Sequence, residues 1–253
     1  MKYTRRVTDL ETALRVLALL RATPIADEAT LVGSAALFGF ETGVPPFTED
    51  VDVCVPEELV IASGEAIVRL LTAQGFAHEL GTATFTRSDG TTFDLLGHGD
   101  VAAGDHIGGH GALRVMVFED LSRVVGALRA THALPGGCRA LTPAGFVATK
   151  LLTERGHKGT KDKLQALLVL AERASDARFV GDVEAIFGGV EAVRREDARA
   201  SAEEAVSALG DPDFRDAGAE GYASAWQDAR AGLAVLLRLL DRVDSGAPAG
   251  DIP

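Results

Sequence analysis

The stretch that decides the fold runs from Thr30 to Val55 and reads TLVGSAALFGFETGVPPFTEDVDVCV. It opens with a short apolar run at 30–32, turns at Gly33-Ser34, and continues into a segment at 35–41 whose composition favours a helix. After a loop that contains two prolines, residues 50–55 alternate polar and β-branched side chains, which is typical of a strand. The stretch therefore predicts a strand, a tight turn into a helix, and a second strand that carries acidic residues.

Two acidic residues, Asp50 and Asp52, are separated by one residue within that second strand. Since successive strand residues point to opposite faces, both carboxylates project from the same face. Asp94 interrupts an apolar run in a further predicted strand at 91–96, and it would supply a third carboxylate if the strands pair. Carboxylate oxygens suit hard divalent cations, so these residues predict a metal site. Two alternatives are that Asp-Val-Asp is a charged edge of the sheet, and that Asp100 replaces Asp94.

Gly33 and Ser34 stand at the start of the predicted helix. The first amide groups of a helix have no partner within it, and they attract phosphate groups. We therefore expect a phosphate-binding turn close to the acidic strand.

These residues resemble a known signature: Gly33-Ser34, then Thr48, Asp50-Val51-Asp52 and a later strand-borne Asp94 are similar to the motifs of the DNA polymerase β-like nucleotidyltransferase superfamily. Within it, the chain is most similar to the AbiEii-type nucleotidyltransferases, the toxins of bacterial toxin–antitoxin systems. Those proteins pair a catalytic sheet with a helical C-terminal half that carries Lys, Arg and a Lys-Asp element. Lys150, Arg155 and Lys161-Asp162 stand in the same order here, and the likeness covers residues 28–170.

The resemblance implies a metal-dependent nucleotidyltransferase that moves a nucleoside monophosphate from an NTP to a hydroxyl acceptor. It implies Mg²⁺ or Mn²⁺ as the cofactor, a tRNA or protein acceptor, and an antitoxin partner. The residues it implies are Asp50, Asp52 and Asp94 as catalytic residues and metal ligands, and Gly33, Ser34, Lys150, Arg155 and Lys161 as nucleotide contacts. The alternatives are an aminoglycoside-type antibiotic nucleotidyltransferase and a non-catalytic relative that binds a nucleotide or a partner.

The charge of the chain is unevenly distributed. The 253 residues include 25 Lys and Arg and 37 Asp and Glu, a net charge of −12 that repels nucleic-acid backbone and argues against an extended surface for it. Four of the five lysines lie at 150–163, and residues 139–163 carry a charge of +4, which leaves −16 for the remainder. This clustering predicts a local anion site, for which an exposed helix face is the alternative.

Strand-like and helix-like patterns divide the chain. Strands are predicted at 83–87 and 91–96, as a hairpin around Ser88-Asp89-Gly90, and at 113–118, whereas 97–111 is Gly-rich and predicts an irregular loop. Helices are predicted at 9–22, where Thr8 and Glu11 form a capping box, and then at 57–74, 142–154, 161–174, 183–192, 200–209 and 222–243. We expect an α+β protein, with a small mixed-sheet nucleotidyltransferase domain flanked by helices at 1–125 and an all-helical domain at 140–245.

The cysteines and the apolar runs bear on the compartment. Cys54 and Cys138 have no metal-ligand spacing, and so few cysteines favour free thiols in a reducing compartment. No segment has the uninterrupted apolar run of a signal peptide or of a membrane span. We expect a cytoplasmic protein without a membrane contact.

Overall fold

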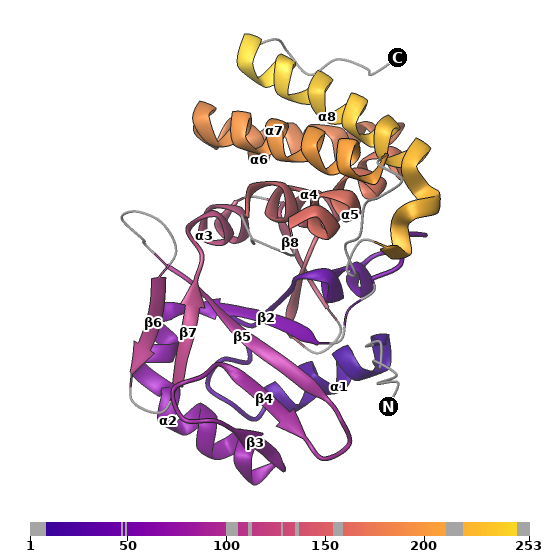
Figure 1. Ribbon diagram of the computed structural model, residues 1–253. Helices are drawn as coiled ribbons and strands as arrows, with labels where there is room; N and C mark the ends of the chain where they lie inside the picture. The colour runs from indigo at the N-terminus through magenta and orange to yellow at the C-terminus, as the bar shows by residue number, and fades with distance from the viewer. Residues whose placement is uncertain are drawn as a thin grey trace. The chain divides into compact units, whose positions relative to one another are not determined.

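The computed structural model describes residues 9–46, 48, 50–99, 106–110, 113–127, 129–134, 137–153, 159–210 and 220–246. The chain has the expected α+β architecture, with a mixed sheet flanked by helices and a helical C-terminal region (Figure 1). It divides into two compact units. The sheet unit comprises Met1–Phe40, Pro46–Val125 and Thr131–Leu141, and the helical unit comprises Glu41–Pro45, Gly126–Ala130 and Thr142–Pro253.

The sheet unit is built on a mixed sheet in the strand order β3-β4-β5-β2-β1-β9-β8, with β7 paired to β5 and β6. Strand β2 runs antiparallel to β1 and parallel to β5. The strands are β1 (Thr30–Val32), β2 (Val51–Pro56), β3 (Phe76–His78), β4 (Thr84–Arg87), β5 (Thr92–His98), β6 (His106–His110), β7 (Leu113–Val117), β8 (Thr131–Ala133) and β9 (Arg139–Leu141). The strand expected to carry Asp-Val-Asp therefore lies in the middle of the sheet rather than at an edge.

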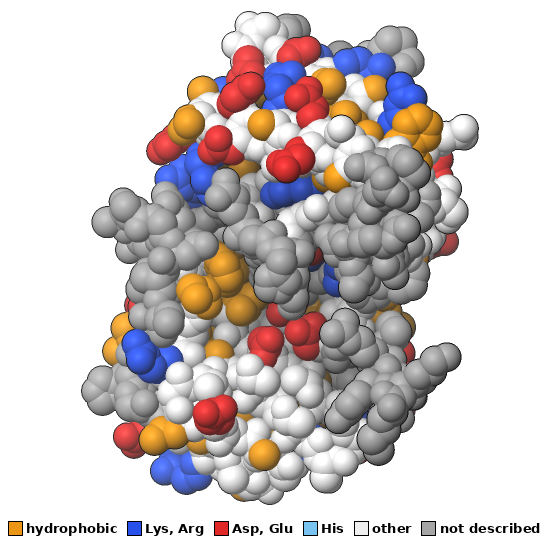
Figure 2. All heavy atoms as spheres, in the orientation of Figure 1, with side chains coloured by type: hydrophobic (Ala, Val, Ile, Leu, Met, Phe, Trp, Pro, Cys, Tyr) orange, Lys and Arg blue, Asp and Glu red, His pale blue; other side chains and the backbone are white. Residues whose placement is uncertain are grey.

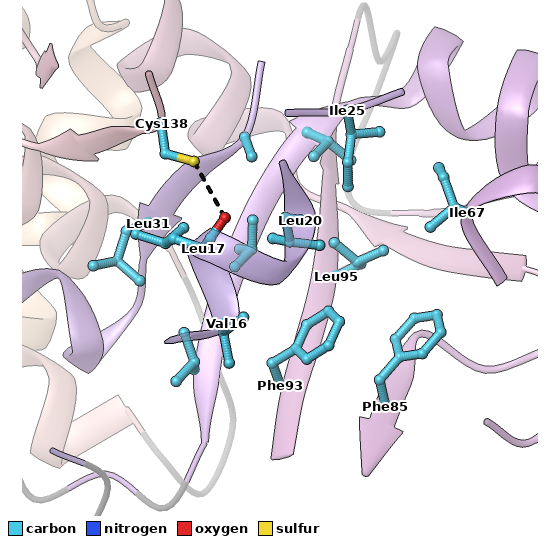
Figure 3. Packing of buried hydrophobic residues seen from close by; sticks show 14 of the residues in the cluster. Val16, Leu17, Leu20, Ile25, Leu31, Ile67, Phe85, Phe93, Leu95 and Cys138 are labelled. Atoms are coloured by element: carbon cyan, nitrogen blue, oxygen red, sulfur yellow. Dashed lines mark hydrogen bonds between the residues drawn. The ribbon is translucent and has the colours of Figure 1, made fainter. Parts of the chain in front are cut away.

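One face of this sheet is apolar and packs against helices α1 (Leu10–Leu20) and α2 (Glu57–Ala73). Figure 3 shows Leu20 of α1 beside Phe93 and Leu95 of β5. The rings of Phe93 and Phe85 stack at 5.0 Å between centroids. Because strand residues alternate between faces, residues next to these buried ones, Asp94 among them, lie on the opposite face. A short helix, α3 (Glu119–Gly126), follows β7.

The predicted start of α1 is wrong in its capping residue. Asp9, rather than Thr8, is the N-cap, and its carboxylate accepts a hydrogen bond from the Thr12 N–H at 2.8 Å. Thr8 lies outside the described residues. An Asp cap satisfies the same exposed amides as a Ser/Thr capping box, which explains why the helix begins where expected.

The helical unit contains the helices expected from the sequence, with adjusted ends. They are α4 (Pro143–Leu152), α5 (Gly159–Glu172), α6 (Ala177–Gly188), α7 (Ala192–Leu209), a 3-10 turn η3 (Glu220–Ala225) and α8 (Trp226–Ser245). Helix α6 begins six residues earlier than expected, because the Asp176 carboxylate caps it by accepting from the amides of Arg178 and Phe179. Helix α5 packs against α4, α7 and α8.

Several short strands were not predicted. The segment at 97–111, expected to be an irregular loop, contains the end of β5 and the whole of β6, which pairs antiparallel with β7. Strands β3, β8 and β9 are three residues long, too short for alternation to be recognised. Tertiary pairing, rather than local pattern, decides such strands.

Both cysteines are buried and neither forms a disulfide, as expected. The Cys138 thiol lies 3.7 Å from the Leu17 carbonyl oxygen (Figure 3), and burial raises its pKa. A thiol in this environment is less nucleophilic than an exposed one. Among the described helices, we find none whose length and apolar composition would let it span a membrane.

The histidine at the end of β5 predicts a pH dependence of stability. Burial lowers the pKa of His98 from its usual 6.5, although the charges of Glu58 and Glu28 oppose the shift. As the pH falls through 6.5, the unfolded chain binds a proton that the folded chain resists, so the free energy of unfolding should decrease. His98→Gln should remove this part of the dependence in urea unfolding followed by circular dichroism. The same slope in both proteins would assign the dependence to other groups.

Candidate metal centre

Three carboxylates meet on the polar face of the sheet. One oxygen from each of Asp50, Asp52 and Asp94 can be chosen so that all three lie within 4.8 Å of one another. Asp52 and Asp94 are register partners on the parallel strands β2 and β5, and Asp50 immediately precedes β2. Figure 2 shows acidic side chains gathered over β2 and β5. The structure therefore brings together the three acids that the sequence predicted.

The three carboxylates differ in exposure and in support. Asp52 is buried, with 8% of its surface exposed, while Asp50 and Asp94 are half-buried. The Thr48 hydroxyl donates to the Asp50 carboxylate at 2.9 Å and also lies 3.2 Å from the Asp50 carbonyl oxygen. This contact orients Asp50 and gives a structural role to Thr48.

The repulsion among these carboxylates favours a cation between them. Charges at such separations, partly withdrawn from water, interact more strongly than exposed charges do. A divalent ion would offset the repulsion, and an all-oxygen ligand set is the one that Mg²⁺ or Mn²⁺ prefers. The cluster thus fits a divalent metal by both its geometry and its donor atoms.

Gly33 allows the turn between β1 and the next element to pass directly against Asp52. Its φ is +59°, and a Cβ built at this position would lie 1.8 Å from Asp52 Oδ2. Any side chain would therefore collide with the carboxylate, besides straining the backbone. Gly33 is required here for its missing side chain as well as for its conformation.

The segment after Gly33 is shorter than predicted. Ser34 begins η1 (Ser34–Gly39), a six-residue 3-10 helix, and not the longer helix expected at 35–41. Ser34 is buried, and Gly33 is the N-cap residue of η1. The pair thus lies beside the carboxylates on a tight turn, and its expected phosphate contact stays a prediction.

Lys150 lies within the helical unit in a buried ion pair. Its ammonium donates to Asp162 Oδ1 at 2.5 Å, and both side chains are 5% exposed. Lys150 comes from the last turn of α4, and Asp162 from the first turn of α5. Its contact with a nucleotide stays a prediction.

Lys163 has a structural role that the sequence did not indicate. Its buried ammonium donates to three carbonyl oxygens at the C-terminus of α4, those of Lys150 at 2.9 Å, Leu151 at 2.7 Å and Thr153 at 3.1 Å. Carbonyls at a helix end have no partner within the helix, and a cation there also meets the negative end of the helix dipole. Lys163, like Lys150, is therefore engaged inside the protein.

The remaining predicted positions are placed only in part. Lys161 is half-buried on α5. Arg155, Lys158 of the lysine cluster, and Asp100, the alternative ligand, lie outside the described residues. The Gln165 side-chain amide donates to the Tyr222 hydroxyl at 2.7 Å, and that hydroxyl donates to the Pro45 carbonyl oxygen at 2.6 Å. These hydrogen bonds were not predicted, because they join distant parts of the chain.

Comparisons with known proteins add little to this geometry. No family model matches the chain, and no curated protein does. Among solved structures, it is similar to one from H. pylori that bears the provisional name nucleotidyltransferase, with 14% identity, a TM-score of 0.48, and coverage of 93% of this chain and 95% of that one. The interpretation of the site therefore rests on its own residues.

Replacing Gly33 tests whether the close approach supports the metal cluster. Gly33→Ala should displace the Asp52 carboxylate and weaken Mn²⁺ binding by about tenfold or more, since neighbours that position ligands have effects of that size. Binding can be followed by electron paramagnetic resonance of free Mn²⁺.

The matched control is Gly75→Ala. Gly75 also has a positive φ, of +89°, but its Cβ would meet nothing within 4 Å. Gly75→Ala should strain the backbone without causing a collision, so its affinity for Mn²⁺ should equal that of wild-type protein. Equal losses in the two variants would contradict the proposed contact.

Replacing Lys163 tests its role at the end of α4. Lys163→Met keeps the length of the side chain but leaves buried carbonyls without their donor, so we expect a loss of about 1–3 kcal/mol in the free energy of unfolding. Trp226, the one tryptophan, lies in the helical unit, so its fluorescence reports on that unit during urea unfolding. Lys161→Met, at a less buried position of the same helix, should cost less, and the reverse order would refute the assignment.

Proposed function

We propose that the chain is a metal-dependent nucleotidyltransferase, with the carboxylates of Asp50, Asp52 and Asp94 as its metal ligands. The observation that supports this is the convergence of the three ligand oxygens, within 4.8 Å, beside the turn at Gly33. Two-metal sites of this donor type stabilise both the attacking and the leaving oxygen of an in-line displacement at phosphorus. Mg²⁺ or Mn²⁺ would supply that stabilisation when bound.

The residues of the chain would perform the remaining steps. Asp94 would accept the proton of the acceptor hydroxyl, whose oxygen attacks the α-phosphorus of an NTP. The new oxygen–phosphorus bond forms as the bond to the β-phosphate oxygen breaks, and pyrophosphate leaves. Gly33 and Ser34 are proposed to position the triphosphate beside Asp52.

The lysine-rich segment of the helical unit is proposed to contribute the other nucleotide contacts. Lys150, Arg155 and Lys161 would neutralise phosphate oxygens, with Asp162 orienting the Lys150 ammonium through their 2.5 Å contact. The nucleotidyltransferase domain would then comprise residues 1–125, and the helical domain 140–245.

The finer identity of the enzyme is also a proposal. Motif order favours the AbiEii toxin type, with a tRNA or protein acceptor, an antitoxin partner and a cytoplasmic location. An aminoglycoside-type antibiotic nucleotidyltransferase is the second candidate, since the acidic chain, at −12, would attract a polycationic drug. A non-catalytic binding relative is the third.

Calorimetry with Asp52→Asn tests the proposed function. In the presence of Mg²⁺, wild-type protein should bind at least one of ATP, GTP, CTP and UTP, and Asp52→Asn should weaken that binding by about tenfold or more because one ligand charge is lost. Without metal, the variant should unfold at the same or a higher temperature, since a repulsive charge is removed.

The control for this experiment is Asp27→Asn. Asp27 is exposed, belongs to the same unit and lies outside the cluster, so its loss changes the net charge equally. Its nucleotide affinity should equal that of wild type. If no nucleotide binds to wild-type protein with Mg²⁺, the enzyme assignment fails.

A further inference from the structure

The carboxylate-bearing face of the sheet continues past Asp94 onto strands β4 and β7. Thr84 is the register partner of Asp94, and Met116 is the partner of Leu96, which follows Asp94 by two residues. Because residues two apart share a face, Arg114 lies on this same side as Met116. We call Thr84, Leu96, Arg114 and Met116 the β4–β7 strip.

Three of the four residues of the strip are accessible, and the opposite side of its strands is not. Thr84 and Arg114 are exposed and Met116 is 39% exposed, whereas Leu96 is buried, at 8%. Their neighbours in the chain form the core on the other face, fully buried: Phe85, Phe93, Leu95, Leu113, Val115 and Val117. The exposed Met116 side chain, on the same side as Arg114 and the carboxylates, suits a ligand that has both apolar and charged parts.

Arg114 supplies the charge of the strip. Its amide lies 3.4 Å from the Thr82 carbonyl, which places β7 next to the start of β4. Within the part of the chain that the structure describes, its guanidinium makes no ion pair, whereas Arg15 and Arg87 of the same unit contact Asp89. The strip itself contains no acidic side chain, so its charge is positive.

The strip and the glycine turn flank the carboxylates on opposite sides. Gly33 reaches Asp52 from the β1 side of β2, whereas the strip lies beyond β5, on the β4 side. If the triphosphate lies at the glycine turn, the strip is left for the second substrate. The hydroxyl of that substrate would then meet Asp94, the carboxylate next to the strip.

We propose that the β4–β7 strip binds the acceptor, and that Arg114 makes it select a hydroxyl compound that carries a phosphate. This inference rests on the proposed function and deepens it. Met116 would contact the apolar part of the acceptor, and Arg114 would donate to its phosphate. Arg114 would disfavour a polycationic acceptor such as an aminoglycoside.

The test compares charged and uncharged probes on protein loaded with Mg²⁺ and a non-transferable α,β-methylene analogue of the NTP that binds. The phosphorylated probes are adenosine 5′-monophosphate and glucose 6-phosphate, each compared with its dephosphorylated form, and kanamycin is the cationic probe. Calorimetry should show that at least one phosphorylated probe binds about tenfold more tightly than its uncharged form. A preference for the adenosine pair would assign the apolar contact to a nucleobase.

Variants of Arg114 assign the preference to this residue. Arg114→Glu should abolish the preference, Arg114→Lys should restore most of it, and both should bind the NTP analogue as wild type does. Arg69→Glu makes the same charge change at an exposed position on α2, outside the strip, and should leave the preference intact.

The outcomes separate the two proposals. If wild-type protein binds no NTP, the proposed function is overturned. Binding of the same probes to the Mg²⁺-loaded protein then still tests whether the strip prefers a phosphorylated compound. Normal NTP binding without a preference for a phosphorylated probe overturns the role of the strip. A preference that survives in Arg114→Glu, or tighter binding of kanamycin than of every phosphorylated probe, overturns it too.

Discussion

The candidate site depends on one register, the parallel pairing of β2 with β5 that sets Asp52 opposite Asp94. A shift of one residue would turn either carboxylate to the apolar face, where Phe93 and Val53 now pack. The hydrophobic core therefore holds the carboxylates together against their own repulsion. Repulsion among the three charges raises the free energy of the folded chain, and burial of the apolar residues on the opposite face of the strands offsets this rise. A bound cation would reduce the repulsion.

The same alternation places the apolar core residues on one face of the sheet and the polar side chains of the candidate site on the other. Inward positions of β2, β4, β5 and β7 form the core with α1 and α2 (Figure 3), and outward positions carry Asp52, Asp94, Thr84 and Arg114. A rigid sheet is a suitable support for such a site, because side chains on strands hold their positions better than side chains on loops.

The helical unit shows a different use of charge. Its buried lysines are held by specific partners, Lys150 by the Asp162 carboxylate and Lys163 by the carbonyls that end α4. The clustering of lysines in the sequence predicts an anion site, and that site stays a prediction. The clustering did not reveal that Lys163 of α5 caps the C-terminus of α4, because a contact between two helices depends on tertiary packing.

The sequence alone was sufficient for the α+β class, for the main helices and for the hairpin around Asp89, since these follow from local periodicity and turn residues. It also named the three acids, from strand alternation at Asp50 and Asp52 and from the single acid in the apolar run around Asp94, although Asp50 lies one residue before β2. Only the tertiary structure decided that β5 is the strand beside them, that Gly33 passes against Asp52, and that short strands such as β6 and β9 complete the sheet. Pairing between distant segments leaves no local pattern, because its energy comes from burial and hydrogen bonds made after the chain has folded.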